Sequence, residues 1–159
     1  MFYSYCILFF IFSFLGWVME VTLTLITDKK FVNRGFLLGP CCPIYGCGCI
    51  LLNLLLQNYV NNIIVLFILT MFTCSLLEYI TSFLMEKIFK LRWWDYSQMR
   101  FNINGRICLE TMTPFSILGV LAIKYATPFF ITNINKLSEK TILIISIILI
   151  TLFIIDVII

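Results

Sequence analysis

Long apolar runs alternate with short polar segments along this chain, and polarity does not alternate within the runs. Such runs are long enough to cross a bilayer as helices, whereas a membrane β-barrel would show strict alternation. We therefore expect an all-α, polytopic helical membrane protein with one integral membrane domain over residues 1–159. The pattern predicts five transmembrane helices, over residues 2–27, 43–59, 63–89, 107–126 and 141–159.

Composition supports the same class of protein. Hydrophobic residues make up 62% of the chain and charged residues 12%, with a mean hydropathy of +1.05. A soluble domain has roughly 45–50% apolar and about 25% charged residues, so a polar shell cannot be built from this sequence. The net charge of +3 comes from basic residues in short loops, which argues against a nucleic-acid partner. The first span lacks a basic leader and a small-residue cleavage site, so we expect it to be retained.

The distribution of lysine and arginine predicts the orientation, because cytoplasmic loops are enriched in these residues. Loops 28–42 and 87–106 carry eight of the eleven basic residues, and the opposite side carries three. This split places the N-terminus outside and the C-terminus inside. If the second span were re-entrant, the split would become six against five and the orientation would lose most of its support. The eight residues are Lys29, Lys30, Arg34, Lys87, Lys90, Arg92, Arg100 and Arg106; the three are Lys124, Lys136 and Lys140.

Four glutamates within or near the predicted spans are the candidate binding residues: Glu20, Glu78, Glu86 and Glu110. A charge at the bilayer centre costs about 2.5–3.5 kcal/mol, so such groups usually face partners or a wet cavity. In the predicted orientation all four lie toward the inner ends of their helices, and we expect them to line one cavity that opens inward. Ser82 lies between Glu78 and Glu86 at helical spacing, so these three share a face.

Five further residues are expected to support this site. Asn33 and Arg34 are either turn residues or ligands of an anionic group, and Trp93 is expected to anchor the chain at the interface. Asp95 either caps a short helix or pairs with an arginine. Arg106 lies four residues before Glu110 and is expected to hold that carboxylate in place.

No cofactor is identified from the sequence. Cys41, Cys42, Cys47 and Cys49 cluster, but the chain has no histidine and no CxxC spacing, so we expect no metal site there. Small cysteines that pack a helix start are the simpler interpretation. A divalent cation is the one cofactor that the glutamate oxygens would suit.

An internal similarity links the two halves of the candidate site. The first span carries Glu20 and leads to the segment 33–35, Asn-Arg-Gly; the third carries Glu86 and leads to 104–106, Asn-Gly-Arg. Both spans are predicted to run in the same direction, so a duplication would be a parallel repeat.

Four segments resemble one family of bacterial membrane proteins, the type IV ABC-transporter family of CmpB-like permeases. They are FSFLGWVMEV at 12–21, FVNRGFLLGPCCPIYG at 31–46, EYITSFLMEKIFKLRWWDYS at 78–97 and FNINGRICLE at 101–110. The resemblance implies a multi-pass protein of the cytoplasmic membrane in Gram-positive, clostridia-like bacteria. It implies a permease-like role in transport. The chain has no GxxxxGK[ST] loop, so an ABC role requires an ATPase subunit, together with a homo-oligomer or partner subunit to complete a pathway.

Several functions fit these features. The first is the membrane component of a transporter that handles a polar solute or ion through an inward-facing, carboxylate-lined cavity. The second is a membrane-embedded enzyme that acts on a lipid-linked substrate by carboxylate acid–base or Mg²⁺-assisted chemistry. The third is a small substrate-binding membrane subunit of a multi-part transporter, and the fourth is a purely structural protein. No catalytic residue can be assigned, and the resemblance favours the first.

Overall fold

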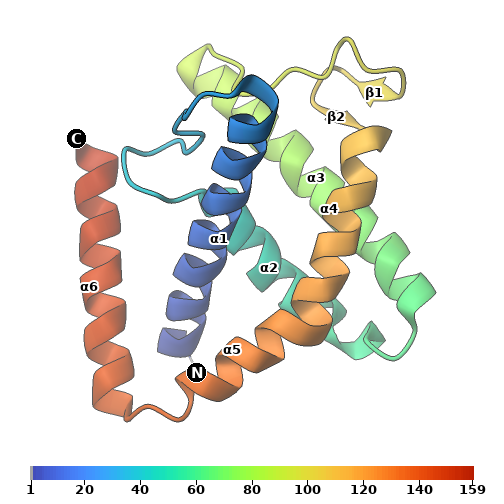
Figure 1. The fold of residues 1–159 in the computed structure, drawn as a ribbon. Coiled ribbons are helices and arrows are strands. Elements are labelled where there is room, and N and C mark those ends of the chain that lie inside the picture. Colours follow the sequence, from blue (N-terminus) through green and yellow to red (C-terminus); the bar gives the residue numbers. More distant parts are fainter. Residues whose placement is uncertain (1) are drawn as a thin grey trace. The chain divides into compact units, whose positions relative to one another are not determined.

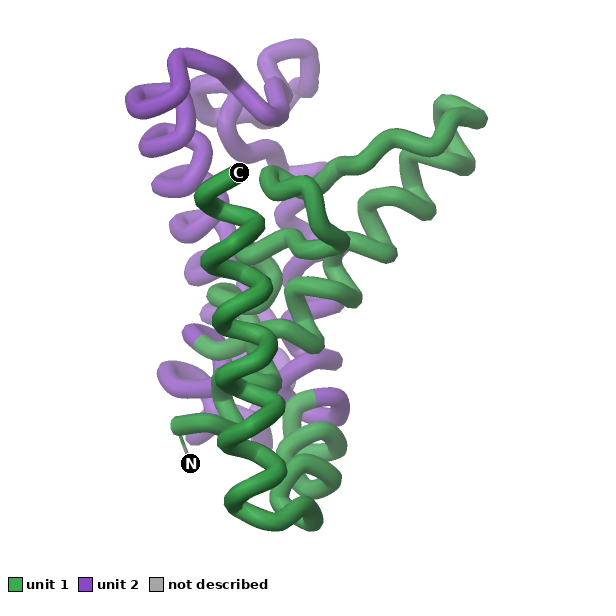
Figure 2. Tube along the Cα trace, turned by 90° about the vertical axis from the view of Figure 1, so that its left-hand side faces the viewer, with its two compact units in different colours: residues 1–50, 127–159 green, residues 51–126 purple. Residues whose placement is uncertain are grey.

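The computed structural model describes residues 2–159, and helices account for 74% of the chain. The chain divides into two compact units, which Figure 2 distinguishes by colour. Unit 1 comprises residues 1–50 and 127–159, and unit 2 comprises residues 51–126. Each unit has its own packing, and each is described separately below.

The elements follow the predicted order, with one break in the fourth helix (Figure 1). A π-helical turn joins α4 to α5 just before Pro128, which has no N–H to continue a regular helix. The elements are α1 (Phe2–Asp28), α2 (Pro43–Leu56), the 3₁₀ turn η1 (Gln57–Tyr59), α3 (Ile63–Phe89), β1 (Asn102–Ile103), β2 (Ile107–Cys108), α4 (Leu109–Leu121), the π-helical turn η2 (Ala122–Ala126), α5 (Thr127–Ile134) and α6 (Glu139–Ile158).

Within residues 2–159, four helical stretches are long and apolar enough to cross a membrane: α1, α3, the stretch Leu109–Ile134 and α6. Three of the predicted spans agree closely with α1, α3 and α6, and the fourth extends beyond its predicted end. The predicted second span corresponds to α2, which has 14 residues. At 1.5 Å per residue α2 is about 21 Å long, less than the hydrocarbon thickness of about 30 Å. The structure therefore has four helices of spanning length, and the five-span count stays a prediction.

In unit 1, α1 and α6 run parallel (Figure 1). The Ser146 hydroxyl donates to the Tyr3 carbonyl at 3.1 Å near one end of the pair. Further along, the rings of Phe10 and Phe153 lie 5.7 Å apart. An apolar cluster that includes Ile7 and Ile142 fills the space between these helices and α5.

The start of α2 packs against the middle of α1. A Cβ at Gly46 would meet the hydroxyl of Ser13 and would lie 2.5 Å from the Phe9 carbonyl oxygen. The Cys42 N–H donates to the Ser13 carbonyl at 3.0 Å, just before α2 begins. Because Ser13 lies near the midpoint of α1, the loop 29–42 folds back along the second half of that helix.

The loop 29–42 is also held by the end of α6. The Asp156 carboxylate accepts hydrogen bonds from the backbone N–H groups of Leu38 and Gly39, at 3.2 and 3.0 Å. A carboxylate that binds two backbone donors satisfies groups that a loop cannot pair within itself. Asp156 thus acts as a structural anchor for this loop.

In unit 2, α3 and α4 form an antiparallel pair. Near the start of α3, Thr70 lies against Gly119 of α4, where a Cβ would stand 2.5 Å from the Thr70 methyl group. Small residues at such a crossing let two backbones approach closely. An apolar cluster of Leu52, Leu56, Leu66, Val120 and Ile123 fills this end of the unit. The other end carries the polar groups of the candidate site.

Candidate functional site

Glu78, Ser82 and Glu86 occupy one face of α3, as their helical spacing predicts. The helix begins at Asn62, whose side chain accepts a hydrogen bond from the Val65 N–H at 3.2 Å. It ends at Phe89, and Lys90 closes it in the left-handed conformation with φ of 59°. The chain then returns toward α3 through residues 90–108, which we call the hairpin loop.

The hairpin loop is shaped by asparagine and glycine. Asn104 and Gly105 have φ values of 54° and 68°, a backbone conformation that these two residue types adopt readily. The Arg106 N–H closes the turn on the Ile103 carbonyl at 3.0 Å. The Asn102 side chain accepts from the Gly105 N–H at 2.9 Å and donates to the Met99 carbonyl at 2.7 Å. An Asn–Gly pair is a turn signal in a sequence, and the structure has a turn at Asn104–Gly105.

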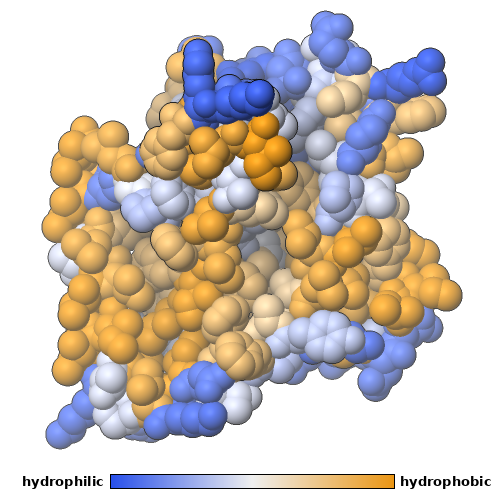
Figure 3. Space-filling model, in the orientation of Figure 1, coloured by the Kyte–Doolittle hydropathy of each residue, from blue (hydrophilic) through white to orange (hydrophobic). Residues whose placement is uncertain are grey.

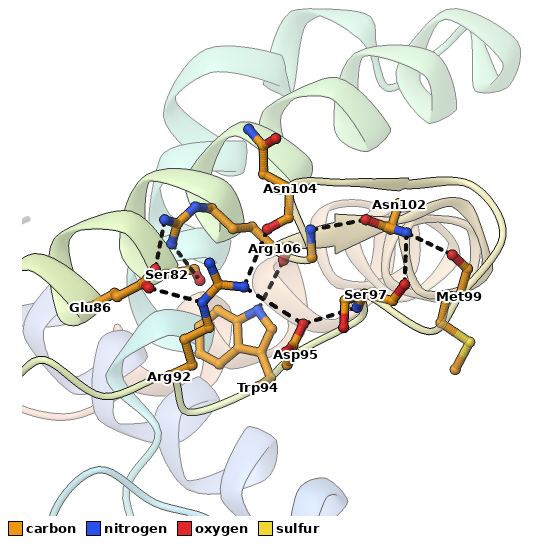
Figure 4. Close-up of polar contacts among 11 residues, drawn as sticks. Ser82, Glu86, Arg92, Trp94, Asp95, Ser97, Met99, Asn102, Asn104 and Arg106 are labelled. Atoms are coloured by element: carbon orange, nitrogen blue, oxygen red, sulfur yellow. Dashed lines mark hydrogen bonds and ion pairs between the residues drawn. The ribbon is translucent and has the colours of Figure 1, made fainter.

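Arg106 is the central residue of this site, and only 9% of its surface is exposed. Figure 4 shows its guanidinium directed at α3, where Nη2 lies 2.6 Å from Oε2 of Glu86 and Nη1 donates to Ser82 Oγ at 3.3 Å. Its charged group also lies over the rings of Tyr79 and Phe83, at 5.7 and 5.4 Å. These contacts fasten the end of the hairpin loop to α3.

Arg92 binds the same glutamate from the other side (Figure 4). Its Nε lies 3.0 Å from Oε1 of Glu86, and its Nη1 lies 3.7 Å from Asp95. The hydrogen bond to Glu86 raises the pKa of Arg92. The Ser97 backbone N–H, aided by Arg92, holds the pKa of Asp95 below its usual range. Both oxygens of Glu86 therefore face arginines, and its charge is balanced.

The indole of Trp94 also stabilises the hairpin loop, because its Nε1 donates a hydrogen bond to the Arg106 carbonyl at 3.0 Å. The ring of Trp93 packs on Phe89 at 5.8 Å between centroids. Asp95 pairs with an arginine, which was one of its two predicted roles.

Glu78 has different surroundings. Its Oε1 accepts a hydrogen bond from the Tyr96 hydroxyl at 3.2 Å. It lies eight residues before Glu86, which corresponds to about 12 Å along the helix. It is half-buried. On the adjacent side of α3, the Tyr79 hydroxyl accepts from the Asn104 side chain at 2.8 Å. Two hydrogen bonds thus connect this deeper part of α3 to the hairpin loop.

Glu20, Asn33 and Arg34 lie together in unit 1. The Tyr45 hydroxyl donates to Glu20, and Nε of Arg34 lies 4.0 Å from the other carboxylate oxygen. The Asn33 side chain accepts from the Trp17 indole at 2.7 Å and donates to carbonyls in the same loop. Asn33 is thus a turn residue, one of its two predicted roles.

The cysteines of unit 1 are free thiols. Burial, with a further contribution from Glu20, raises the pKa of Cys42 to about 11, so its thiol stays protonated at neutral pH. Among residues 2–159, no three His, Cys, Asp or Glu side chains come together as metal ligands.

One predicted contact needs correction. Arg106 pairs with Glu86 instead of Glu110, because the hairpin loop folds back onto α3. Glu110 lies exposed in the first turn of α4, where a negative charge interacts favourably with the helix dipole. Glu78 and Glu86 share unit 2 with Glu110, whereas Glu20 belongs to unit 1. Convergence of all four glutamates on one cavity stays a prediction.

Two tyrosines that bind the candidate glutamates were not predicted as site residues. Tyr96 binds Glu78, and Tyr45 binds Glu20. The available signal was a tyrosine in or just after the loop that follows each glutamate-bearing helix. In both units, an arginine of that loop also faces a glutamate of the preceding helix, Arg34 with Glu20 and Arg106 with Glu86. The predicted internal similarity thus has a counterpart in the contacts.

Several apolar helices of spanning length, with carboxylates held on them by arginine-bearing loops, define a multi-pass helical membrane protein. The chain belongs to the family described as Putative ABC-transporter type IV, whose family model matches residues 7–159. Searches among curated proteins and among solved structures found no match.

Proposed function

We propose that this chain is the membrane component of an ABC-type transporter in the bacterial cytoplasmic membrane, and that it handles a polar solute or an ion. Family membership over nearly the whole chain supports the transport role. The sequence has no phosphate-binding loop, so a separate ATPase subunit supplies the energy. Four helices of spanning length are few for a complete permease, so a second copy or a partner subunit completes the pathway.

The binding residue in this proposal is Glu78, and the observation that carries it is its position. Glu78 lies eleven positions, or about 16 Å of helix, before the end of α3 at Phe89. A carboxylate so far inside a spanning helix is costly unless it faces a partner or a wet cavity, so its position points to a functional role. Glu86 is less suited to a cation, because Arg92 and Arg106 already balance its charge. Glu78 and the Tyr96 hydroxyl offer oxygen ligands.

Replacing Glu78 by glutamine is expected to keep the fold and abolish ligand binding. The purified chain would be screened for thermal stabilisation by a panel of polar solutes and inorganic cations. A ligand at 100 times its Kd stabilises the folded state by about 2.7 kcal/mol, and the variant should lose this gain. Glu139→Gln is the matched control, because Glu139 is exposed in the first turn of α6. Equal stabilisation of Glu78→Gln and the native chain would refute the assignment, and product formation by the purified chain alone would favour an enzyme.

We further propose five membrane crossings, with the N-terminus outside. The support comes from α1 and α6, which run parallel in unit 1. Suppose that α1 and α6 both cross the membrane. If only α3 and the stretch Leu109–Ile134 crossed in the chain between α1 and α6, then α1 and α6 would be antiparallel. A third crossing is therefore needed, and the segment of α2 and η1 is the one available.

Accessibility labelling would test this topology. Cysteines introduced at Asn61 and Lys136 are expected to react with a membrane-impermeant maleimide added to intact cells. Cysteines at Lys30 and Arg100 should react only after the cells are opened. Because the native cysteines also react, each variant is compared with the unmodified chain. Reaction at Lys30 from outside would contradict the orientation.

A further inference from the structure

The hairpin loop has one apolar face that the rest of unit 2 leaves uncovered. Ile103 pairs with Ile107 across the ribbon, and the Leu109 N–H bonds the Phe101 carbonyl at 3.1 Å. Directly opposed residues lie on the same face of a ribbon, and alternate residues along a strand do as well. Phe101, Ile103, Ile107 and Leu109 therefore share a face. Ile107 is buried, but Phe101, Ile103 and Leu109 are 67%, 56% and 45% exposed.

This face continues onto the uncovered side of α4. Leu109 is the first residue of α4, and Thr113 and Ile117 follow it at helical spacing. All three side chains are exposed. In a helical stretch of spanning length, exposed apolar residues favour a lipid environment. The apolar face of the ribbon is thus an extension of the lipid-facing surface of α4 beyond the start of the helix.

Three basic residues in the hairpin loop and the last turn of α3 form no ion pair within residues 2–159. In the hairpin loop and the last turn of α3, the two acidic residues are Glu86 and Asp95, and both are engaged by arginines. Lys87, Lys90 and Arg100 remain exposed and form no ion pair within residues 2–159. Figure 3 shows hydrophilic side chains collected near helix ends, with hydrophobic ones along the helices, on the face in view.

We propose that the hairpin loop is a lipid-binding element, which inserts its apolar face among the acyl chains and binds anionic phospholipid headgroups through Arg100, Lys87 and Lys90. An exposed apolar surface in a segment with surplus positive charge fits the boundary between acyl chains and anionic headgroups. Continuity with α4 favours lipid over a docked protein, because the same surface continues as an exposed apolar face along a helical stretch of spanning length. The network around Arg106 then holds the ribbon at the membrane surface. This role does not depend on which solute the protein handles.

Photo-crosslinking would test the proposal. The photoreactive residue p-benzoylphenylalanine replaces Phe101, and the full chain is reconstituted in vesicles with equal parts of phosphatidylcholine and phosphatidylglycerol. Irradiation is expected to give lipid adducts, with phosphatidylglycerol in excess. The same probe at Gln98, an exposed polar position of the loop, should give at least fivefold fewer adducts. Arg100→Gln should lower the excess of phosphatidylglycerol by about fivefold, as expected for one basic residue near the surface.

Three results would overturn the proposal. They are the absence of lipid adducts at position 101, equal yields at positions 101 and 98, and adducts that show no preference for phosphatidylglycerol. In native membranes, a protein adduct at position 101 that exceeds the lipid adduct would identify the face as a docking site for a partner subunit. A circular dichroism spectrum like that of the native chain ensures that a negative result is not due to misfolding.

Discussion

Arg106→Ala is expected to lower the free energy of unfolding by about 3 kcal/mol and to release the hairpin loop from α3. The guanidinium is buried, forms an ion pair with Glu86 and donates a hydrogen bond to Ser82, and a hydrogen bond to a charged group contributes about 1.5–3 kcal/mol. It also packs over two aromatic rings. Unfolding in sodium dodecyl sulfate, followed by circular dichroism, would measure the loss. Hydrogen exchange at residues 100–108 would report the release of the loop.

Arg100→Ala is the matched control, because Arg100 is exposed in the same loop and forms no ion pair within residues 2–159. It should leave the stability within about 0.5 kcal/mol of the native value. Arg106→Lys keeps the charge but carries its donors on a single nitrogen, so it cannot reproduce the fork that reaches Glu86 and Ser82, and its stability should fall between the two. If Arg106→Ala and Arg100→Ala were equally stable, the network would have no structural role. A double-mutant cycle with Glu86→Ala would then show no coupling.

Gly46→Leu is expected to separate α2 from α1 and to destabilise unit 1 by about 3 kcal/mol, the upper end of the usual cost of overpacking. A Cβ at this position would meet the Ser13 hydroxyl and would stand 2.5 Å from the Phe9 carbonyl oxygen. The carbonyl belongs to the α1 backbone and cannot rotate away, so the whole helix must move. Thermal unfolding in detergent would show the effect.

Cys47→Leu gives a matched comparison for this change. Cys47 is the next residue of α2 and is exposed, so a leucine there has room. Gly46→Ala should already lower the stability, since the Cβ alone causes the clash. Native-like melting of both Gly46 variants would mean that α1 and α2 do not approach each other as closely as described.

Substitutions at Arg106 and Gly46 should also affect the proposed transport function. Arg106 holds the hairpin loop against α3, which carries Glu78. Gly46 lets α2 approach α1, which carries Glu20. Substitution of Arg106 or Gly46 should therefore impair ligand binding by distorting the structure, and the free energy of unfolding should fall as well. Glu78→Gln should impair binding with stability preserved. The two kinds of variant thus separate a scaffold role from a ligand role.

The sequence by itself determined the class of protein and the local geometry of the site. Apolar runs predicted α1 and α3 almost to the residue, because burial in lipid requires about 20 apolar residues and a helix that satisfies its own backbone. The spacing of Glu78, Ser82 and Glu86 predicted their common face. Asn104–Gly105 predicted a turn, because these residues tolerate positive φ. All of these depend on residues close together in the chain.

Only the tertiary structure decided which charged groups meet. Arg106 lies four residues from Glu110 and twenty from Glu86, yet it binds Glu86, because the hairpin loop folds back onto α3. The packing of the start of α2 against the middle of α1 could not be predicted from the sequence either. It depends on the return path of a loop and on a close approach at Gly46. Several glutamates were eligible partners by charge alone. Periodicity is a local property of the chain, whereas the choice among distant partners is made by packing.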